Sequence, residues 1–87
     1  MGGGAVNLLE KARTSKAGWH RKELDSLYIG FGFIMKHGSK HDKFYHPDHP
    51  ELFAFVPRHA TKLGEYNVTN AIKLIERLQK LEEARHG

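Results

Sequence analysis

The length and composition of this chain limit its architecture and narrow the functions open to it. Eighty-seven residues make one small domain without room for a deep cleft, so a functional site is expected on a surface. The absence of cysteine excludes disulfide scaffolds and thiolate zinc sites. A net charge of +4 favours an anionic partner, with nucleic acid the commonest and an acidic protein the rival, although it also simply keeps a small domain soluble.

The first segment predicts neither a secretory signal nor a membrane anchor. No basic region precedes an apolar stretch, and no apolar run is long enough to cross a bilayer. We therefore expect a soluble cytoplasmic protein without a membrane partner. Residues 5–13 predict a weakly amphipathic helix and residues 14–18 a loop. On this basis residues 1–19 are expected to be an N-terminal extension and residues 20–87 the domain proper.

A helix is predicted over residues 20–30, where Gly30 and Gly32 end it. Its apolar face at helical spacing consists of Leu24, Leu27, Tyr28 and Phe31. Three strands with turns at 38–39 and 47–50 are then predicted over residues 33–37, 41–46 and 51–56. A loop over 58–66 leads to a last helix over 68–84, with Asn67 as its N-cap. The expected fold is α+β, with a three-stranded antiparallel sheet and helices on one face.

The alternation of side chains along the strands predicts which of them face solvent. If Phe44 faces the core, His41, Lys43 and Tyr45 share the opposite face. A bulge would reverse this assignment, because Phe44 and Tyr45 compete for the inward position. The third strand is apolar on both sides of its pleat, which indicates core on one side and partial cover on the other. We expect core positions for Phe31, Phe33, Phe44, Phe53 and Phe55. Tyr45 and Trp19 are either core residues or platforms for a stacked base.

Histidines gather in one stretch of the chain. Five of the seven fall between positions 37 and 59, and His41 stands at a predicted strand start beside the Gly38-Ser39 turn. Histidine titrates in the range needed to move a proton, and RNA cleavage by the 2′-hydroxyl requires a proton acceptor and a proton donor. His41 is therefore a candidate for proton transfer, although a histidine at a strand start is commonly just a solvated residue.

Phosphate contacts are expected from the turn and from nearby cations. The backbone N–H groups around Gly38 and Ser39 can approach a phosphate because glycine has no side chain in the way. The candidate cationic side chains are Lys36, Lys40, Lys43, Arg58 and Lys62. Together they outline a substrate-binding surface around the His41 turn.

Metal binding is the first rival interpretation of this stretch. His37-x3-His41 and His46-x2-His49 have spacings that zinc sites use. On strands, however, residues an odd number apart point to opposite faces, and His41 and His46 are five apart. We therefore predict no metal site and favour solvated histidines on turns.

The last helix offers a second basic surface. Lys73, Arg77 and Lys80 recur on one side of it. Glutamates lie between them, so we expect intrahelical ion pairs such as Glu76–Lys80 to neutralise this side.

Four segments stand in a characteristic order: Glu23-Leu24…Leu27…Gly32-Phe33, then Gly38-Ser39-Lys40-His41-Asp42-Lys43-Phe44-Tyr45-His46-Pro47, then Val56-Pro57-Arg58-His59, then Val68…Ile72…Ile75. This pattern, over roughly residues 20–80, resembles the HicA-like toxin family. The resemblance implies a small domain of the double-stranded-RNA-binding type with the order α-β-β-β-α. It also implies a ribosome-independent mRNA endoribonuclease that is neutralised by an antitoxin protein of the HicB type.

The resemblance also assigns the catalytic residue. In the family it is the histidine of a Gly-Ser-His motif at the start of the second strand, and counting back from His46-Pro47 places His41 there. Lys40 is an extra residue between Ser39 and His41, which lengthens the turn.

Three hypotheses follow. The first is a toxin that cleaves mRNA with His41 as general acid or base and needs neither a metal nor another cofactor. The second is a non-catalytic RNA-binding module of the same fold, which contacts RNA through its shape and its phosphates. The third is one half of a protein–protein pair whose partner masks the His41 face.

Overall fold

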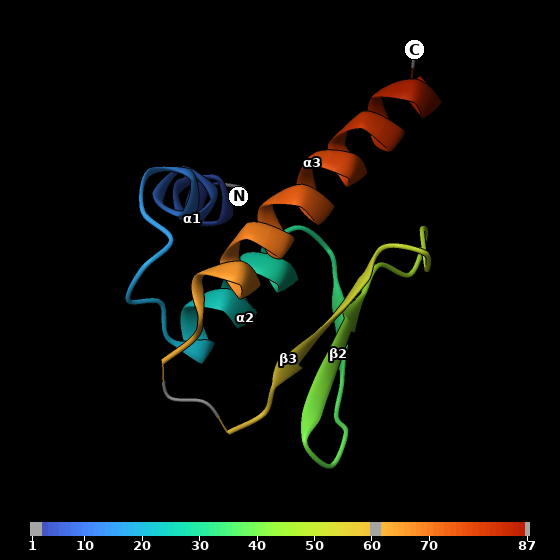
Figure 1. Ribbon diagram of the computed structural model, residues 1–87. Helices are drawn as coiled ribbons and strands as arrows, with labels where there is room; N and C mark the ends of the chain where they lie inside the picture. The colour runs from blue at the N-terminus through green and yellow to red at the C-terminus, as the bar shows by residue number, and fades with distance from the viewer. Residues whose placement is uncertain (1–2, 60–61, 87) are drawn as a thin grey trace.

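The computed structural model describes residues 3–59 and 62–86, and it confirms the predicted α+β class. Its elements are α1 (Gly3–Thr14), α2 (Arg21–Gly30), β1 (Ile34–Lys36), β2 (His41–Tyr45), β3 (Phe53–Pro57) and α3 (Glu65–His86) (Figure 1). After α1 the order is α-β-β-β-α, as predicted. Within the two described ranges, no helix combines the length and the apolar character needed to cross a bilayer.

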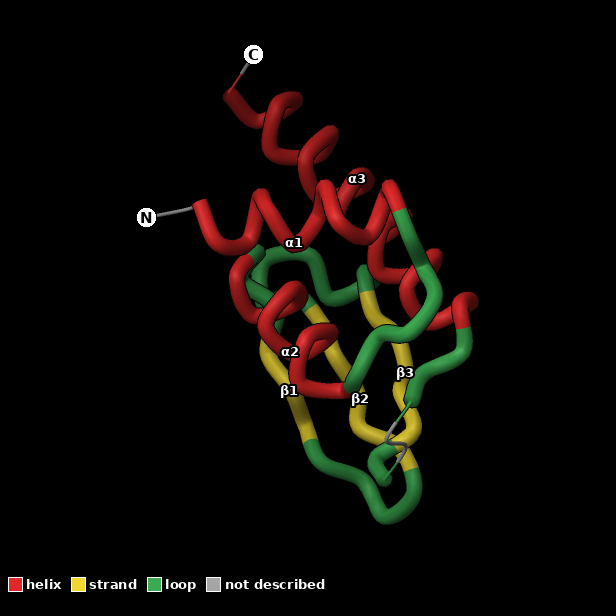
Figure 2. The backbone as a smooth tube through the Cα atoms, turned by 90° about the vertical axis from the view of Figure 1, so that its left-hand side faces the viewer, coloured by secondary structure: helices red, strands yellow, loops and turns green. Residues whose placement is uncertain are grey.

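The strands form one antiparallel sheet in the order β1-β2-β3. Phe44 of the central strand pairs with Met35 on one side and with Ala54 on the other. The three helices lie on one face of the sheet, and the C-terminal part of α3 extends past it (Figures 1 and 2). The opposite face, called the open face below, carries Ile34, Lys36, His41, Lys43, Tyr45, Phe53 and Phe55.

The core lies between the sheet and the helices. Phe44 stacks on Tyr28 of α2 with ring centroids 4.5 Å apart, and Phe33 packs against the same tyrosine at 5.1 Å. α2 contributes the predicted face of Leu24, Leu27 and Tyr28, all fully buried, while Phe31 packs at its edge. The helix ends as expected, because Gly32 adopts a φ of +89° that favours glycine.

The N-terminal extension is part of this core. Leu9 and Ala12 of α1 are buried, and an ion pair joins Lys11 to Glu23 of α2. Trp19 is fully buried and donates its indole N–H to the Ser15 carbonyl at 2.9 Å. Trp19 is therefore a core residue and not an exposed platform for a base. Residues 1–19, which we expected to form an extension, thus supply three buried side chains to the domain.

The last helix begins earlier than its sequence suggests. α3 starts at Glu65, so the prediction of Asn67 as N-cap was wrong and so was the loop as far as residue 66. Asn67 is instead buried within the first turn, and its backbone N–H donates to the Gly64 carbonyl at 3.1 Å. Glu65 explains the earlier start, since a carboxylate in the first turn interacts favourably with the helix dipole. Part of the predicted loop, residues 60–61, lies outside the described residues.

The third strand also differs from the prediction. β3 begins at Phe53 and runs through Pro57, whereas residues 51–56 were expected. Leu52 and Val56 face the core, but Phe53 and Phe55 are 46% and 58% exposed. Their predicted core positions were therefore wrong, because alternation turns every second side chain of β3 toward the open face.

Candidate functional site

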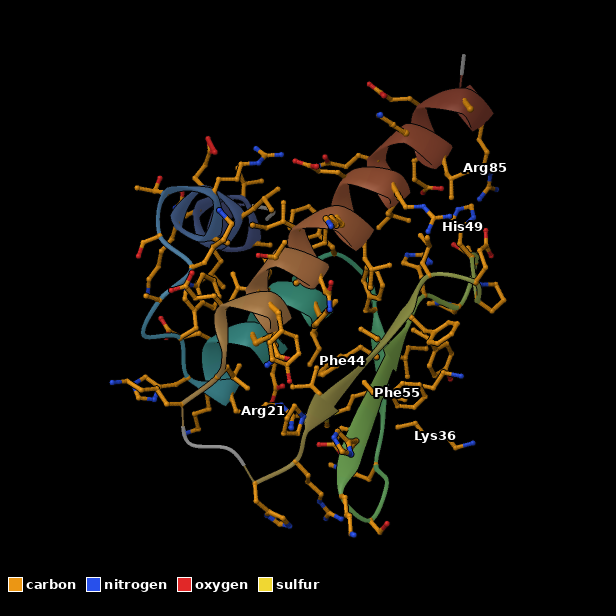
Figure 3. All side chains as sticks on the ribbon, in the orientation of Figure 1. Arg21, Lys36, Phe44, His49, Phe55 and Arg85 are labelled. Carbon is orange, nitrogen blue, oxygen red and sulfur yellow. The ribbon has the colours of Figure 1, made fainter. Side chains whose placement is uncertain are left out.

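The open face brings the predicted polar residues into rows across the sheet. Lys36 lies opposite Lys43, which lies opposite Phe55. Ile34, Tyr45 and Phe53 form the neighbouring row. Figure 3 shows Lys36 and Phe55 on the side of the sheet away from the helices, and Phe44 on the helical side. The predicted sharing of one face by His41, Lys43 and Tyr45 is thus confirmed.

His41 is the first residue of β2 and pairs with Pro57 of β3. Its exposed side chain borders a shallow hollow, called the His41 pocket, whose other walls are Gly38, Ser39, Lys40 and Phe55. Within the described part of the chain, no hydrogen bond or ion pair engages the His41 ring. The imidazole is therefore open to a ligand.

The loop that forms this pocket is held from its outer side by Arg58. The Arg58 guanidinium donates to the Gly38 carbonyl at 2.9 Å, and its backbone N–H donates to the Lys40 carbonyl at 3.0 Å. Gly38 approaches the His41 carbonyl so closely that a Cβ at this position would overlap with it. These contacts fix the turn through Lys40, and His41 follows it as the first residue of β2.

A buried carboxylate holds the same loop from the core side. Asp42 is 2% exposed; it accepts a hydrogen bond from Arg21 at 2.6 Å and lies 3.0 Å from His37 Nδ1. Burial alone would raise the pKa of Asp42, but the hydrogen bonds from Arg21 and His37 outweigh it and hold the pKa below its usual range. The Gly38 N–H also points toward Asp42, at 3.4 Å.

Arg21, which pairs with Asp42, also contacts another residue of α2 and the end of β3. It pairs with Asp25 one turn along α2 at 2.7 Å, and it donates to the Pro57 carbonyl at the end of β3 at 3.0 Å. The residue that pairs with Pro57 in the sheet is His41 itself. One guanidinium thus ties α2 to both strands that position His41.

The structure gathers most, but not all, of the predicted site residues. Gly38, Ser39 and Lys40 line the His41 pocket, and Arg58 closes its loop. Lys36 and Lys43 lie beside the pocket on the open face. Lys62 is elsewhere, because it forms a β-bridge with His20, just before α2. The roles that the sequence predicted for these residues stay predictions.

Two of the other histidines, His46 and His49, have structural partners. His46 is buried and accepts the Asp48 N–H through Nδ1 at 3.1 Å, while His49 lies 3.1 Å from Glu82 of α3. The His49 hydrogen bond is the main cause that lowers the pKa of Glu82. Figure 3 shows His49 beside the C-terminal half of α3. Across the described ranges, no three His, Asp or Glu side chains are grouped as a metal site would need.

Sequence reasoning missed the aromatic character of the open face. Phe53 and Phe55 pack edge to face with ring centroids 5.9 Å apart, and Lys43 Nζ lies 4.9 Å from the Phe53 ring. Tyr45 is half-buried beside them. The two-sided apolar pattern of residues 51–56 was the available clue, because it predicted a second face that something covers.

The basic side of α3 is also more available than predicted. Glu76 pairs with Arg13 of α1 at 3.2 Å and not with Lys80, so the expected intrahelical pair is absent from the described residues. Lys73 and Arg77 border a hollow against β3. Within the residues described, neither of these two side chains forms an ion pair.

Comparison with known proteins identifies no relative. No family model matches the chain, and neither a curated protein nor a solved structure matches it. Function is therefore inferred from the chain's own residues.

Proposed function

We propose that the chain is a metal-independent endoribonuclease of the toxin–antitoxin type, an mRNA interferase that acts in the cytoplasm and uses His41 for proton transfer. The observation that carries the proposal is the exposed His41 ring in a pocket whose loop is fixed from both sides. Ser39 and Lys40 line the pocket beside the ring, and Lys36 and Lys43 lie on the same sheet face. A mobile loop would not hold a proton-transfer group in one geometry, whereas this one is anchored.

The chemistry requires little beyond these groups. The 2′-hydroxyl oxygen of the RNA attacks the adjacent phosphorus, the bond from phosphorus to the 5′-oxygen breaks, and the proton moves from the first oxygen to the second. A histidine can take the proton from the attacking oxygen or deliver one to the leaving oxygen. Lys40 and Lys43 would stabilise the negative charge that develops on the phosphate.

The proposal includes a protein partner. The resemblance to the HicA-like family predicts an antitoxin of the HicB type. An uncovered sheet face with exposed aromatic rings is a surface that such a partner can mask. A neighbouring reading frame that encodes a small protein able to bind this chain would support this part of the proposal.

The test is incubation of the full chain with a long single-stranded RNA in EDTA, followed by gel electrophoresis. Wild type is expected to cut the RNA, and His41→Ala is expected to reduce the rate by about 100-fold or more, since general acid–base groups contribute that much. His59→Ala is the matched control, because this histidine is exposed and does not line the His41 pocket. Full cleavage by a folded His41→Ala variant would refute the role of His41.

The second candidate is the non-catalytic RNA-binding module. The exposed rings of Phe53 and Phe55 beside Lys43 favour it, since such a surface binds RNA without chemistry. Under this alternative neither wild type nor His41→Ala cuts the RNA, yet both retard it on a native gel. Binding then weakens as the salt concentration rises.

A further inference from the structure

A groove runs between β3 and α3, along one edge of the open face. Its walls are Phe53, Ala54 and Phe55 from the strand and Asn70, Lys73, Leu74 and Arg77 from the helix. Lys73 and Leu74 lie three and four residues after Asn70, and Arg77 lies four and three residues after them, so all four lie along one side of α3. Phe55 also lines the His41 pocket. The β3–α3 groove and the His41 pocket therefore meet at one aromatic side chain.

The strand side of the groove offers aromatic rings. Phe53 and Phe55 are about half exposed, and the planes of their rings meet at an angle of 76°. Two such rings on a sheet are platforms on which unpaired bases stack, and this stacking tolerates any base because each has a π-face. Asn70 on the opposite wall is exposed and carries both a donor and an acceptor for a base edge.

The helical side of the groove is positively charged. Lys73 and Arg77 form no ion pair among the described residues, and Glu76, which lies between them in the sequence, pairs with Arg13 at 3.2 Å. None of the side chains that border the groove is acidic. An aromatic floor with unneutralised cations along one wall complements an anionic polymer with exposed bases better than it complements an apolar protein surface.

We infer that the β3–α3 groove binds single-stranded RNA, with bases stacked on Phe53 and Phe55 and phosphates held by Lys73 and Arg77. A single strand is required because the bases of a duplex are already paired and stacked, which leaves no base face for a side chain. The inference deepens the proposed function, on which it rests for the choice of polymer. It assigns the substrate class and extends the contact surface from the His41 pocket to α3.

The experiment measures binding without cleavage. Fluorescence anisotropy follows a fluorescein-labelled single-stranded RNA of mixed sequence titrated with the His41→Ala chain at several salt concentrations. In a plot of the logarithm of the binding constant against the logarithm of the salt concentration, the slope measures the number of phosphate contacts. Combining Lys73→Ala and Arg77→Ala with His41→Ala is expected to make this slope shallower by about 1.4, which is about 0.7 for each lost phosphate contact. Combining Phe53→Ala with His41→Ala is expected to weaken binding by about tenfold and to leave the slope unchanged, because the substitution removes a ring and no charge.

Lys16→Ala with Lys22→Ala is the matched control, because it removes two charges from the segment that leads into α2 and from α2 itself. Its reduction of the salt dependence should be clearly smaller than that of the groove pair. Equal effects of the two pairs would overturn the inference, as would a duplex that binds as tightly as the single strand. If Phe53→Ala unfolds, Phe53→Leu provides the same test with an apolar side chain that has no ring.

The outcomes separate this inference from the proposed function. Wild-type cleavage that is lost in His41→Ala, with RNA affinity unaffected by the groove variants, would leave the nuclease intact and refute the groove. RNA binding that depends on the groove, in a chain that never cuts RNA, would support the groove and refute the nuclease.

Discussion

At the scale of single residues, the core includes a polar atom that the fold leaves unsatisfied. The Tyr28 hydroxyl is buried without a hydrogen-bond partner among the described residues, and burial raises the pKa of this phenol well above its usual value. Its ring nevertheless stacks on Phe44 and touches Phe33. The ring is thus the part of Tyr28 that stabilises the core, whereas the hydroxyl opposes folding.

Tyr28→Phe is therefore expected to raise the free energy of unfolding by about 1 kcal/mol, since it removes a desolvated group and no hydrogen bond. Urea denaturation followed by circular dichroism measures the change. Tyr45→Phe is the control, because that ring lies on the open face and its hydroxyl is not in the core. A less stable Tyr28→Phe protein would show that the hydroxyl has a partner in solution.

Asp42 is the residue whose ionisation matters most to the site. Its folded-state pKa is lowered, so its contribution to stability is present above the usual carboxyl pKa near 3.8 and is lost as the pH falls through the lower, folded value. Asp42→Asn removes the buried carboxylate that pairs with Arg21 and His37 and leaves Arg21 with Asp25 as its carboxylate partner, so it is expected to cost about 2 kcal/mol at neutral pH. The deficit of the variant should narrow below pH 3.8, in denaturation curves recorded at a series of pH values. A deficit that stays constant down to pH 2 would contradict the ion pair.

At the scale of elements, α1 is integrated into the domain through a few side chains. Leu9 is 3% exposed, and Ala5 of α1 approaches Gly30 of α2 so closely that a larger residue at Gly30 would displace it. Arg13 reaches α3 through Glu76. Because α1 contacts both other helices, it supports the layer that packs on the sheet.

Leu9→Ala is expected to lower the free energy of unfolding by about 3 kcal/mol, in the range found for buried leucines. Thermal melting with parallel urea titration measures the loss. Val6→Ala in the same helix is the matched control, because Val6 is 51% exposed and should change stability little. Equal effects of the two substitutions would mean that α1 does not pack in solution as it does here.

At the scale of the whole molecule, the order of elements and the helical core face could be predicted because their apolar spacing is regular. The solvent face of β2 could be predicted only on the condition that Phe44, and not its neighbour Tyr45, faces the core, and the structure meets that condition. β3 could not be resolved in this way, because its side chains are apolar on both faces and the pattern does not say which face is covered. The start of α3 was missed because a carboxylate in the first turn, here Glu65, also favours a helix N-terminus, and the prediction considered only the asparagine cap.

Part of the candidate site could likewise be predicted from the sequence, and part could not. The turn around His41 could be singled out from residue types that lie close together in sequence. The anchor beneath it could not, because Arg21 and Asp42 come from separate elements and meet only in the fold. Lys62 was wrongly grouped with the site. It follows the other cations along the chain, but in the fold it lies beside His20, just before α2.

The mixture of lysines and aromatic rings on the open face bears on the solubility of the isolated chain. An uncovered sheet with Ile34, Phe53 and Phe55 exposed could pair with another copy, and protruding cations are a common defence against such aggregation. Lys36 and Lys43 stand between these apolar side chains and repel a second positively charged copy. The repulsion acts over about 10 Å at 0.1 M salt and only about 3 Å at 1 M. High salt dissociates RNA from a basic protein. It therefore also weakens the electrostatic repulsion that prevents free copies of the chain from aggregating.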